Sequence, residues 1–334
     1  MELITVHNNI NNEPPPFIVD DEPVIAEKET NQQFIQANTD EVDLDHLKRD
    51  CIIPNFSKDN ETTISHQEFI EVAQESIYKL FPHEQISLPD IRVSHQIKGR
   101  IPEAIGKPAK ELQEFEKTIY YERMAFVINL PTIRNVVNGN ELSLSIGGVR
   151  AYNQENLYCK KTMEKFKIFI GFQNSVCTNL CINTDGFKGE LRASSPQQLR
   201  EEIMMLFQSY NAEQHLKDMH SFGVYELPEK QFAQFIGRAR LYHYLPKQLR
   251  QHIPTLELND GQINAVAKAY YEDENFGSFG NSSINLWNLY NLFTGATKSS
   301  YIDTFLERTV NAHQLTKGFR NALEGDTTYQ WFLG

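Results

Sequence analysis

The chain has few of the features that mark secreted or membrane-spanning proteins. Only four of its 334 residues are cysteines, too few for a disulfide framework at this length. No apolar run approaches the roughly 20 residues that span a bilayer. The first residues lack a basic stretch followed by an apolar one, so no signal peptide is expected. These absences predict a reduced cytoplasmic protein that does not contact membranes.

Positive charge is also scarce, since 32 Lys and Arg stand against 44 Asp and Glu. The acidity is concentrated in residues 1–61, which contain 14 of the acidic and only four of the basic residues. The run Pro14-Pro15-Pro16 lies there too, with few apolar residues to offset the entropy lost on ordering. We therefore expect residues 1–60 to form a mostly disordered acidic leader. Its deletion should leave the thermal midpoint nearly unchanged.

Residues 61–334 show the patterns of a single α+β domain. Apolar residues recur with period two over about residues 88–193, and Asn138-Gly139 is a typical hairpin turn. Residues from about 195 to 324 instead show helical periodicity. Ser65 with Glu68, and Asn259 with Gln262, have the spacing of helix capping boxes. The order of elements predicts an antiparallel sheet in the first half, followed by a mainly helical second half.

Metal and hydrolase motifs are weak or missing. Cys177 and Cys181 are separated by three residues, and a zinc site would need Cys159 and a further ligand such as His95. Buried free thiols are the commoner arrangement, so neither a metal nor another cofactor is expected. The sequence has no G-x-S-x-G motif, and His215 and His220 lack the spacing of H-E-x-x-H. The presence of an enzyme activity stays open.

The segment "GATKSS" offers a weak anion site. It lacks the glycine spacing of a phosphate-binding loop, so it is not a Walker motif. Lys298, Ser299 and Ser300 nonetheless precede an expected helix, whose free N–H groups favour anions. The alternative is purely structural, with Ser300 and Asp303 as a capping pair at the start of that helix.

Two segments are rich in cations and poor in carboxylates. Residues 92–110 contain His95 and one carboxylate, Glu103, beside five basic residues: Arg92, Lys98, Arg100, Lys107 and Lys110. Residues 238–252 contain no carboxylate, and their basic residues are Arg238, Arg240, Lys247 and Arg250, interleaved with Tyr242 and Tyr244. Cations beside aromatic rings suit single-stranded nucleic acid, whose phosphates meet charge and whose bases stack. We expect the two segments to converge on one face.

The stretch "NLWNLYNLFTG" carries Asn285, Asn288 and Asn291 at intervals of three residues. The rest of its expected helix is almost wholly apolar, which predicts burial. Buried amides must be hydrogen-bonded, so the asparagines are expected to tie this helix to neighbouring backbone rather than to read bases.

Several motifs in order resemble domain-of-unknown-function family 3871, a family of Bacteroides-type bacterial proteins. They are "DIRVSHQIKGRIPEA", "YYERMAF", "IGFQNSVCTNLC", "QFAQFIGRARLYHYLP" and "NLWNLYNLFTGATKSSYIDTFLERTVNA". The resemblance runs from about Ile91 to Phe332 and leaves the leader outside. Two shorter pieces, "NSVCTNLC" and "LYNLFTG", are distantly similar to the phage- and plasmid-related family 932. The resemblance implies an intracellular accessory protein of a mobile genetic element.

Three functions remain open. The first is non-enzymatic binding of single- or double-stranded nucleic acid, which requires a shared basic face. The second is an enzyme acting on a phosphorylated or nucleic-acid substrate, which requires a deep pocket joining His95, Lys298 and Asp303. The third is a protein–protein adaptor or inhibitor of host defence, with a host or element-encoded partner. Dispersed charges and an exposed apolar patch would favour that third function.

Overall fold

The structure is a computed structural model that describes residues 4–5, 33–53, 63–104, 106–154 and 163–334. The strands are β1 (Ile4–Thr5), β2 (Asp40–Val42), β3 (Asp90–Val93), β4 (Gln96–Arg100), β5 (Lys117–Tyr121), β6 (Arg123–Val137), β7 (Asn140–Ala151), β8 (Glu164–Asn174), β9 (Leu180–Cys181), β10 (Phe187–Ala193), β11 (Glu226–Pro228) and β12 (Ser283–Asn285). The helices are α1 (Leu44–Arg49), α2 (His66–Leu80), α3 (Pro196–Ser209), α4 (Ala212–Phe222), α5 (Glu229–Tyr242), α6 (Lys247–Arg250), α7 (Asp260–Glu272), α8 (Leu286–Thr297), α9 (Ile302–Leu323) and α10 (Gln330–Leu333).

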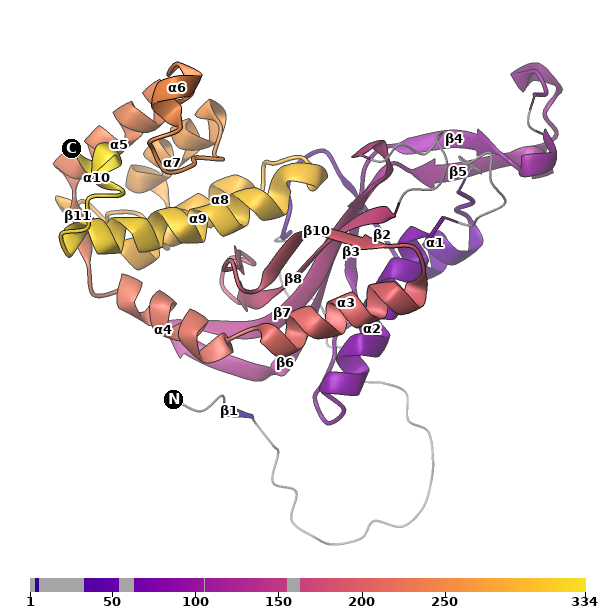
Figure 1. Ribbon diagram of the computed structural model, residues 1–334, viewed down its shortest axis with the longest axis horizontal. Coiled ribbons are helices and arrows are strands. Elements are labelled where there is room, and N and C mark those ends of the chain that lie inside the picture. Colours follow the sequence, from indigo (N-terminus) through magenta and orange to yellow (C-terminus); the bar gives the residue numbers. More distant parts are fainter. Residues whose placement is uncertain (1–3, 6–32, 54–62, 105, 155–162) are drawn as a thin grey trace, which may run out of the picture.

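The main sheet is antiparallel and runs in the order β10-β8-β7-β6-β3-β2, with β1 paired to β6 and β9 paired to β8. Strands β4 and β5 form a separate two-stranded arm that projects from one end of the molecule, while α5, α6, α7 and α10 lie at the other end (Figure 1). The predicted fold class is confirmed, because the sheet is built mainly from residues before 194 and helices dominate after them.

Local sequence signals account for several element boundaries. Asn138 and Gly139 adopt φ values of 48° and 85° in the turn that joins β6 to β7, as the hairpin signal predicts. The predicted capping box at Ser65 and Glu68 starts α2. The register of β6 against β7 shifts between Leu130 and Arg134, where Pro131 is tolerated because a bulge leaves a residue without a ladder hydrogen bond.

Both faces of the sheet are buried. Phe126 and Phe166 point to one face, where the ring of Phe69 on α2 packs edge-on against each at centroid distances of 5.2 and 4.9 Å. Val127, the next residue along β6, points to the opposite face, where Phe305 near the start of α9 belongs to the same apolar cluster. This alternation follows from the two-residue period of a strand. It explains why the central strands contain so few exposed residues.

Residues 33–53, which belong to the expected leader, pack on the rest of the protein. Phe34 and Ile35 are buried with Phe305 on the second face of the sheet, and the backbone amides of residues 36 and 37 donate to the carbonyl of Lys298 at 2.8 and 3.1 Å. Strand β2 then extends the sheet and α1 packs beside α2. The remainder of the predicted leader, apart from β1, lies outside the described residues.

Hydrogen bonds that involve asparagine side chains join the helical half to the sheet. The Nδ2 group of Asn174, the last residue of β8, donates to Oδ1 of the buried Asn291 on α8 at 3.1 Å. Asn179 donates to the carbonyl of Asn291 at 3.0 Å, and the indole Nε1 of Trp287 donates to Oδ1 of Asn140 on β7 at 2.7 Å. We call these three contacts the amide seam. The side chain of Asn291 is hydrogen-bonded as predicted, but its partners are the side chain of Asn174 and the carbonyl of Trp287 in its own helix, not neighbouring backbone.

Replacing Phe34 with Ala should lower the free energy of unfolding by about 3 kcal/mol, because it leaves a cavity among fully buried neighbours. The measurement is urea unfolding of the full chain. Ile52→Ala is the control, because Ile52 is 45% exposed and its loss should change stability by less than about 1 kcal/mol. Equal, small effects of both substitutions would show that residues 33–37 do not pack on the sheet in solution.

Two buried histidines should make stability fall in acid. Burial lowers the pKa of His66 to about 3, helped by the nearby Arg150, and burial lowers the pKa of His313 to about 4. The unfolded chain therefore binds more protons than the folded chain below the ordinary pKa of about 6.5. The stabilisation is complete above that pH and is lost as the pH falls toward the folded-state values. We expect a loss of about 2 kcal/mol per histidine between about pH 6.5 and 4.5.

The control for this pH effect is a pair of glutamine variants. Urea unfolding at each pH gives the free energy of unfolding, and its slope against pH reports the protons taken up on unfolding. His313→Gln should reduce that uptake by about one proton over this interval. His83→Gln should leave it unchanged, because His83 is exposed. An identical pH dependence in all three proteins would contradict the assignment of His313 as a buried neutral group.

Candidate functional site

The two basic segments do not share a face. Residues 92–110 lie in β3, β4 and the loop of the β4–β5 arm, whereas residues 238–252 lie at the end of α5, in α6 and in the turns around it. The β4–β5 arm and the α5–α6 region are at opposite ends of the longest axis of the molecule, and β3 lies in the main sheet between them (Figure 1). The prediction that the two segments converge is therefore wrong.

Arg92 is an internal residue. Its side chain is buried, and it forms ion pairs with Glu41 at 2.8 Å and with Asp90 at 3.5 Å. Glu41 belongs to β2, so the contact fastens this edge strand to β3. A guanidinium that is desolvated and already paired has little to offer a phosphate.

Along the β4–β5 arm, cations are accompanied by carboxylates. His95 and Lys98 are exposed, but Arg100 donates to the carbonyl of Lys107. Lys107 in turn pairs with Glu116, and Lys117 pairs with Glu114 at 2.5 Å. Glu116, like Glu41 and Asp90, lies outside the window that looked basic. The arm is a surface of mixed charge.

Most of the second segment also contacts the protein itself. Arg238 donates to the carbonyl of Trp331 and lies 5.5 Å from the centre of its ring, while Arg240 makes a two-pronged ion pair with Asp260 at 2.9 and 3.3 Å. Tyr242 is buried against Trp331 and Phe332, which leaves little of its ring exposed for a base to stack on. Lys247 is exposed and has no ion pair among the described residues.

The predicted anion site at residues 298–300 is occupied by internal hydrogen bonds. The buried Nζ of Lys298 donates to the carbonyl of Cys177 and to Oγ1 of Thr178 at 3.0 Å. Burial lowers the pKa of Lys298 to about 8. Ser299 is exposed, and its Oγ donates to the carbonyl of Ala296 at 2.8 Å.

Ser300 is buried and accepts hydrogen bonds from Gln262 at 2.8 Å and Arg308 at 3.1 Å. The alternative assignment of Ser300 as a cap is wrong too, because α9 starts after Tyr301 with no hydrogen bond from a capping side chain. The side chains of Lys298, Ser299 and Ser300 thus stabilise the turn between α8 and α9. Because their hydrogen bonds are made within the protein, the structure does not support a phosphate site at these residues.

The thiols show no arrangement for metal binding among the described residues. Within these ranges, no three His, Cys, Asp or Glu side chains come close enough together to hold an ion. Burial raises the pKa of Cys177 to about 11 and that of Cys181 further, so both are protonated thiols at neutral pH. Cys159, the third cysteine considered for zinc, lies outside the described residues.

A cluster that the sequence motifs did not reveal surrounds Cys51. His46 Nδ1 contacts Asp50 at 2.8 Å, and its Nε2 lies 3.9 Å from Cys51 Sγ and 3.0 Å from the hydroxyl of Tyr121. These are the residue types of a thiol nucleophile, its base and an orienting acid. Burial and the nearby Asp50 raise the pKa of Cys51 to about 11, however, so the nucleophilic thiolate is scarce. The tyrosine also competes for the imidazole.

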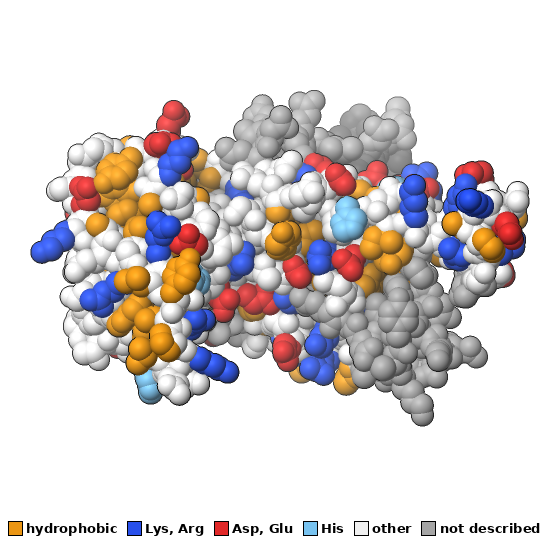
Figure 2. All heavy atoms as spheres, turned by 90° about the horizontal axis from the view of Figure 1, so that it is seen from above, with side chains coloured by type: hydrophobic (Ala, Val, Ile, Leu, Met, Phe, Trp, Pro, Cys, Tyr) orange, Lys and Arg blue, Asp and Glu red, His pale blue; other side chains and the backbone are white. Residues whose placement is uncertain are grey.

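Exposed apolar side chains gather at the helical end. Leu241, Tyr244 and Leu249 are 61, 80 and 56% exposed and lie within nine residues of one another, at the end of α5 and in α6. We call them the α5–α6 surface. Of the 15 large hydrophobic residues exposed in the described part of the chain, five lie between Leu241 and Phe279. Figure 2 shows hydrophobic side chains collected on this end of the molecule.

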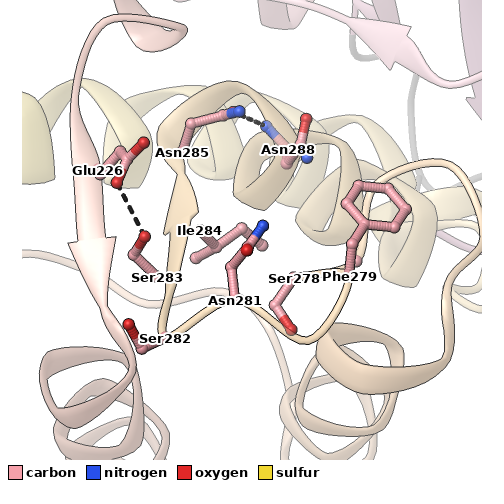
Figure 3. A pocket seen from close by; sticks show the side chains of 10 residues that line it. Glu226, Ser278, Phe279, Asn281, Ser282, Ser283, Ile284, Asn285 and Asn288 are labelled. Atoms are coloured by element: carbon pink, nitrogen blue, oxygen red, sulfur yellow. Dashed lines mark hydrogen bonds between the residues drawn. The ribbon is translucent and has the colours of Figure 1, made fainter.

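A polar hollow lies on the same half of the molecule, between the β11–β12 ribbon and the start of α8 (Figure 3). Its volume is about 470 Å³. The side chains that line it come from Glu226 on β11 and from one continuous stretch: Ser278, Phe279, Asn281, Ser282, Ser283, Ile284, Asn285 and Asn288. None of the three cavities described for this structure is lined by His95, Lys298 or Asp303, as the enzyme hypothesis requires.

Sequence inspection singled out two of these lining residues, but for another role. Asn285 caps α8 by accepting from the amide of Asn288 at 2.8 Å, and Asn288 lies half-exposed in the wall of the hollow. Glu226 and Phe279 were missed, because no spacing links residues 53 positions apart. The sequence feature that could have indicated this hollow is the stretch "GSFGNSSIN", residues 277–285. Its small and polar residues are typical of a surface loop that binds a ligand.

No helix in the described parts of the chain is long and apolar enough to cross a membrane. Comparisons with curated proteins and with solved structures found no match. A family match covers residues 18–333, and it therefore includes most of the segment before residue 60 that the motif resemblance left outside. The family is described as "Domain of unknown function, B. Theta Gene description (DUF3871)". Because the match spans far more than half of the chain, the protein belongs to this family, as its sequence motifs predict.

Proposed function

We propose that the protein is a non-enzymatic adaptor that docks on another protein through the α5–α6 surface. The observation that carries the proposal is the exposure of Leu241, Tyr244 and Leu249 within nine residues of the chain, at the end of α5 and in α6. Contiguous exposed apolar side chains are characteristic of interaction sites in soluble proteins. A tyrosine at the centre of such a surface is a common energetic anchor.

The arrangement of charge supports a protein partner over nucleic acid. A nucleic-acid surface needs several unpaired cations on one face, yet Arg92, Arg238 and Arg240 all make contacts within the protein. The cations sit at two distant ends and so do not add to one another. The enzyme alternative has the least support, since its three proposed residues do not meet in a described cavity.

The partner's chemistry follows from the rim of the surface. Lys247 and His252 are exposed there, and residues 238–252 contain no carboxylate. An acidic rim around an apolar anchor would complement this pattern, because complementary charges steer encounter and suppress wrong partners. The family resemblance adds the context of a mobile genetic element, so the proposed partner is a host or element-encoded protein in the cytoplasm.

The test is site-specific photo-crosslinking of the full chain in cells. A photoreactive phenylalanine analogue at position 244 should give one discrete covalent adduct, because Tyr244 lies at the centre of the proposed interface. Leu249→Ser should weaken adduct formation about tenfold, the effect of losing one anchor worth about 1.4 kcal/mol. Urea unfolding of that variant should stay within about 0.5 kcal/mol of the parent, since the side chain is exposed.

The same analogue at position 78 is the matched control, because Tyr78 is an exposed tyrosine on α2. It should give no adduct of the same mass. An adduct at position 244 that nuclease removes would favour nucleic acid instead. Adducts of equal yield at positions 78 and 244, or none at either, would contradict the adaptor proposal.

A further inference from the structure

The residues that line the polar hollow differ in chemistry from those of an anion site and from those of an apolar pocket. Its side chains offer one carboxylate, three asparagine amides and three serine hydroxyls, and none of its ten lining residues is Lys, Arg or His. A phosphate or carboxylate ligand would face Glu226 with no cation to balance it. An apolar ligand would leave these polar groups without partners, at a cost in free energy.

Groups that both donate and accept hydrogen bonds match this wall best. Glu226 accepts from the hydroxyl of Ser283 at 2.8 Å, which orients the carboxylate from β11 toward the strand opposite. Asn285 uses its Oδ1 to cap α8, which leaves its Nδ2 group as the donor at the edge of the hollow. Asn281 is exposed and lies between Glu226 and Phe279 (Figure 3). Hydroxyl groups both donate and accept, so a polyhydroxylated ligand can satisfy carboxylate and amide together.

Phe279 supplies the apolar side of the hollow. The backbone of Phe279 itself adopts an unfavourable conformation. Its φ is 53°, in the left-handed region that bulky residues rarely adopt, and the adjacent Gly280 has a φ of 78°. Its ring is 61% exposed, so the ring gains little from burial in return. Strain of this kind at an exposed residue is characteristic of binding sites, where presenting a side chain outweighs stability.

We propose that this hollow, formed by β11, the loop before β12 and the start of α8, binds a neutral, hydroxyl-rich ligand such as a hexose unit. Asn281, Asn285 and Glu226 hydrogen-bond its hydroxyls, and the C–H face of the sugar ring lies on the Phe279 ring. The volume of about 470 Å³ falls in the range of small-molecule sites, about 300–1,000 Å³. The site is separate from the α5–α6 surface and needs no protein partner.

The experiment is saturation-transfer NMR with the full chain and a panel of glucose, galactose and N-acetylglucosamine. At about 10 mM sugar, a millimolar dissociation constant is readily detected. At least one neutral sugar should bind, and glucose 6-phosphate should bind at least about tenfold more weakly than glucose because it meets a carboxylate without a cation. Glucosamine tests whether a positive charge, rather than the hydroxyls, is what Glu226 recognises.

Two substitutions connect binding to these side chains. Phe279→Gly and Asn281→Ala should each weaken binding of that sugar about tenfold, while Met205→Ser, at an exposed site on α3, should not. Phe279→Gly should also melt about 2–4 °C above Phe279→Ala, because only glycine relieves the left-handed backbone. Sugar binding that survives Phe279→Gly, binding of charged ligands alone, or no binding of any neutral sugar would each overturn the proposal.

Discussion

The amide seam between α8 and the sheet is the constraint on which the rest of the molecule depends. Asn291 is almost fully buried, and its side chain and carbonyl meet amide groups from Asn174 and Asn179. A buried amide without partners is costly, so these groups accept only one register of the helix on the sheet. Trp287 adds a contact with Asn140 at the hairpin end of β7. The position of α8 then determines where the surrounding helices lie.

That constraint has a functional consequence, because the helical end and the β4–β5 arm are held apart. The α5–α6 surface and the polar hollow both belong to the helical half, and the two hollow-forming segments meet through the pairing of β11 with β12 directly before α8. The arm carries the other basic segment at the far end (Figure 1). A single large ligand that uses both basic segments is therefore disfavoured by the arrangement itself, whereas two independent binding sites on the helical half are compatible with it.

Local signals in the sequence predicted the fold well, and the predictions that failed depend on distant segments. The hairpin at Asn138-Gly139 and the capping box at Ser65 are encoded within a few residues, so sequence inspection finds them. The carboxylates that pair with Arg92 and Arg240 are Glu41 and Asp260, which lie outside the basic windows.

Residues 33–53 and the polar hollow likewise depend on contacts between segments that are distant in the sequence. Phe34 and Ile35 stand in an acidic segment, and only the groove beside Phe305 gives them a reason to be ordered. Glu226 and Phe279 share a wall only because two short strands pair. Composition describes a segment, whereas burial and ion pairing depend on what the fold places beside it.

The most direct test of this account is hydrogen exchange of Asn291→Ala compared with Asn288→Ala, whose side chain is half-exposed. If the amide seam fixes the two halves together, Asn291→Ala lowers the protection of amides in α8 and in β7 and β8 by the same amount, about 2 kcal/mol. Asn288→Ala should change neither. A loss of protection confined to α8, with β7 and β8 unaffected, would contradict the account.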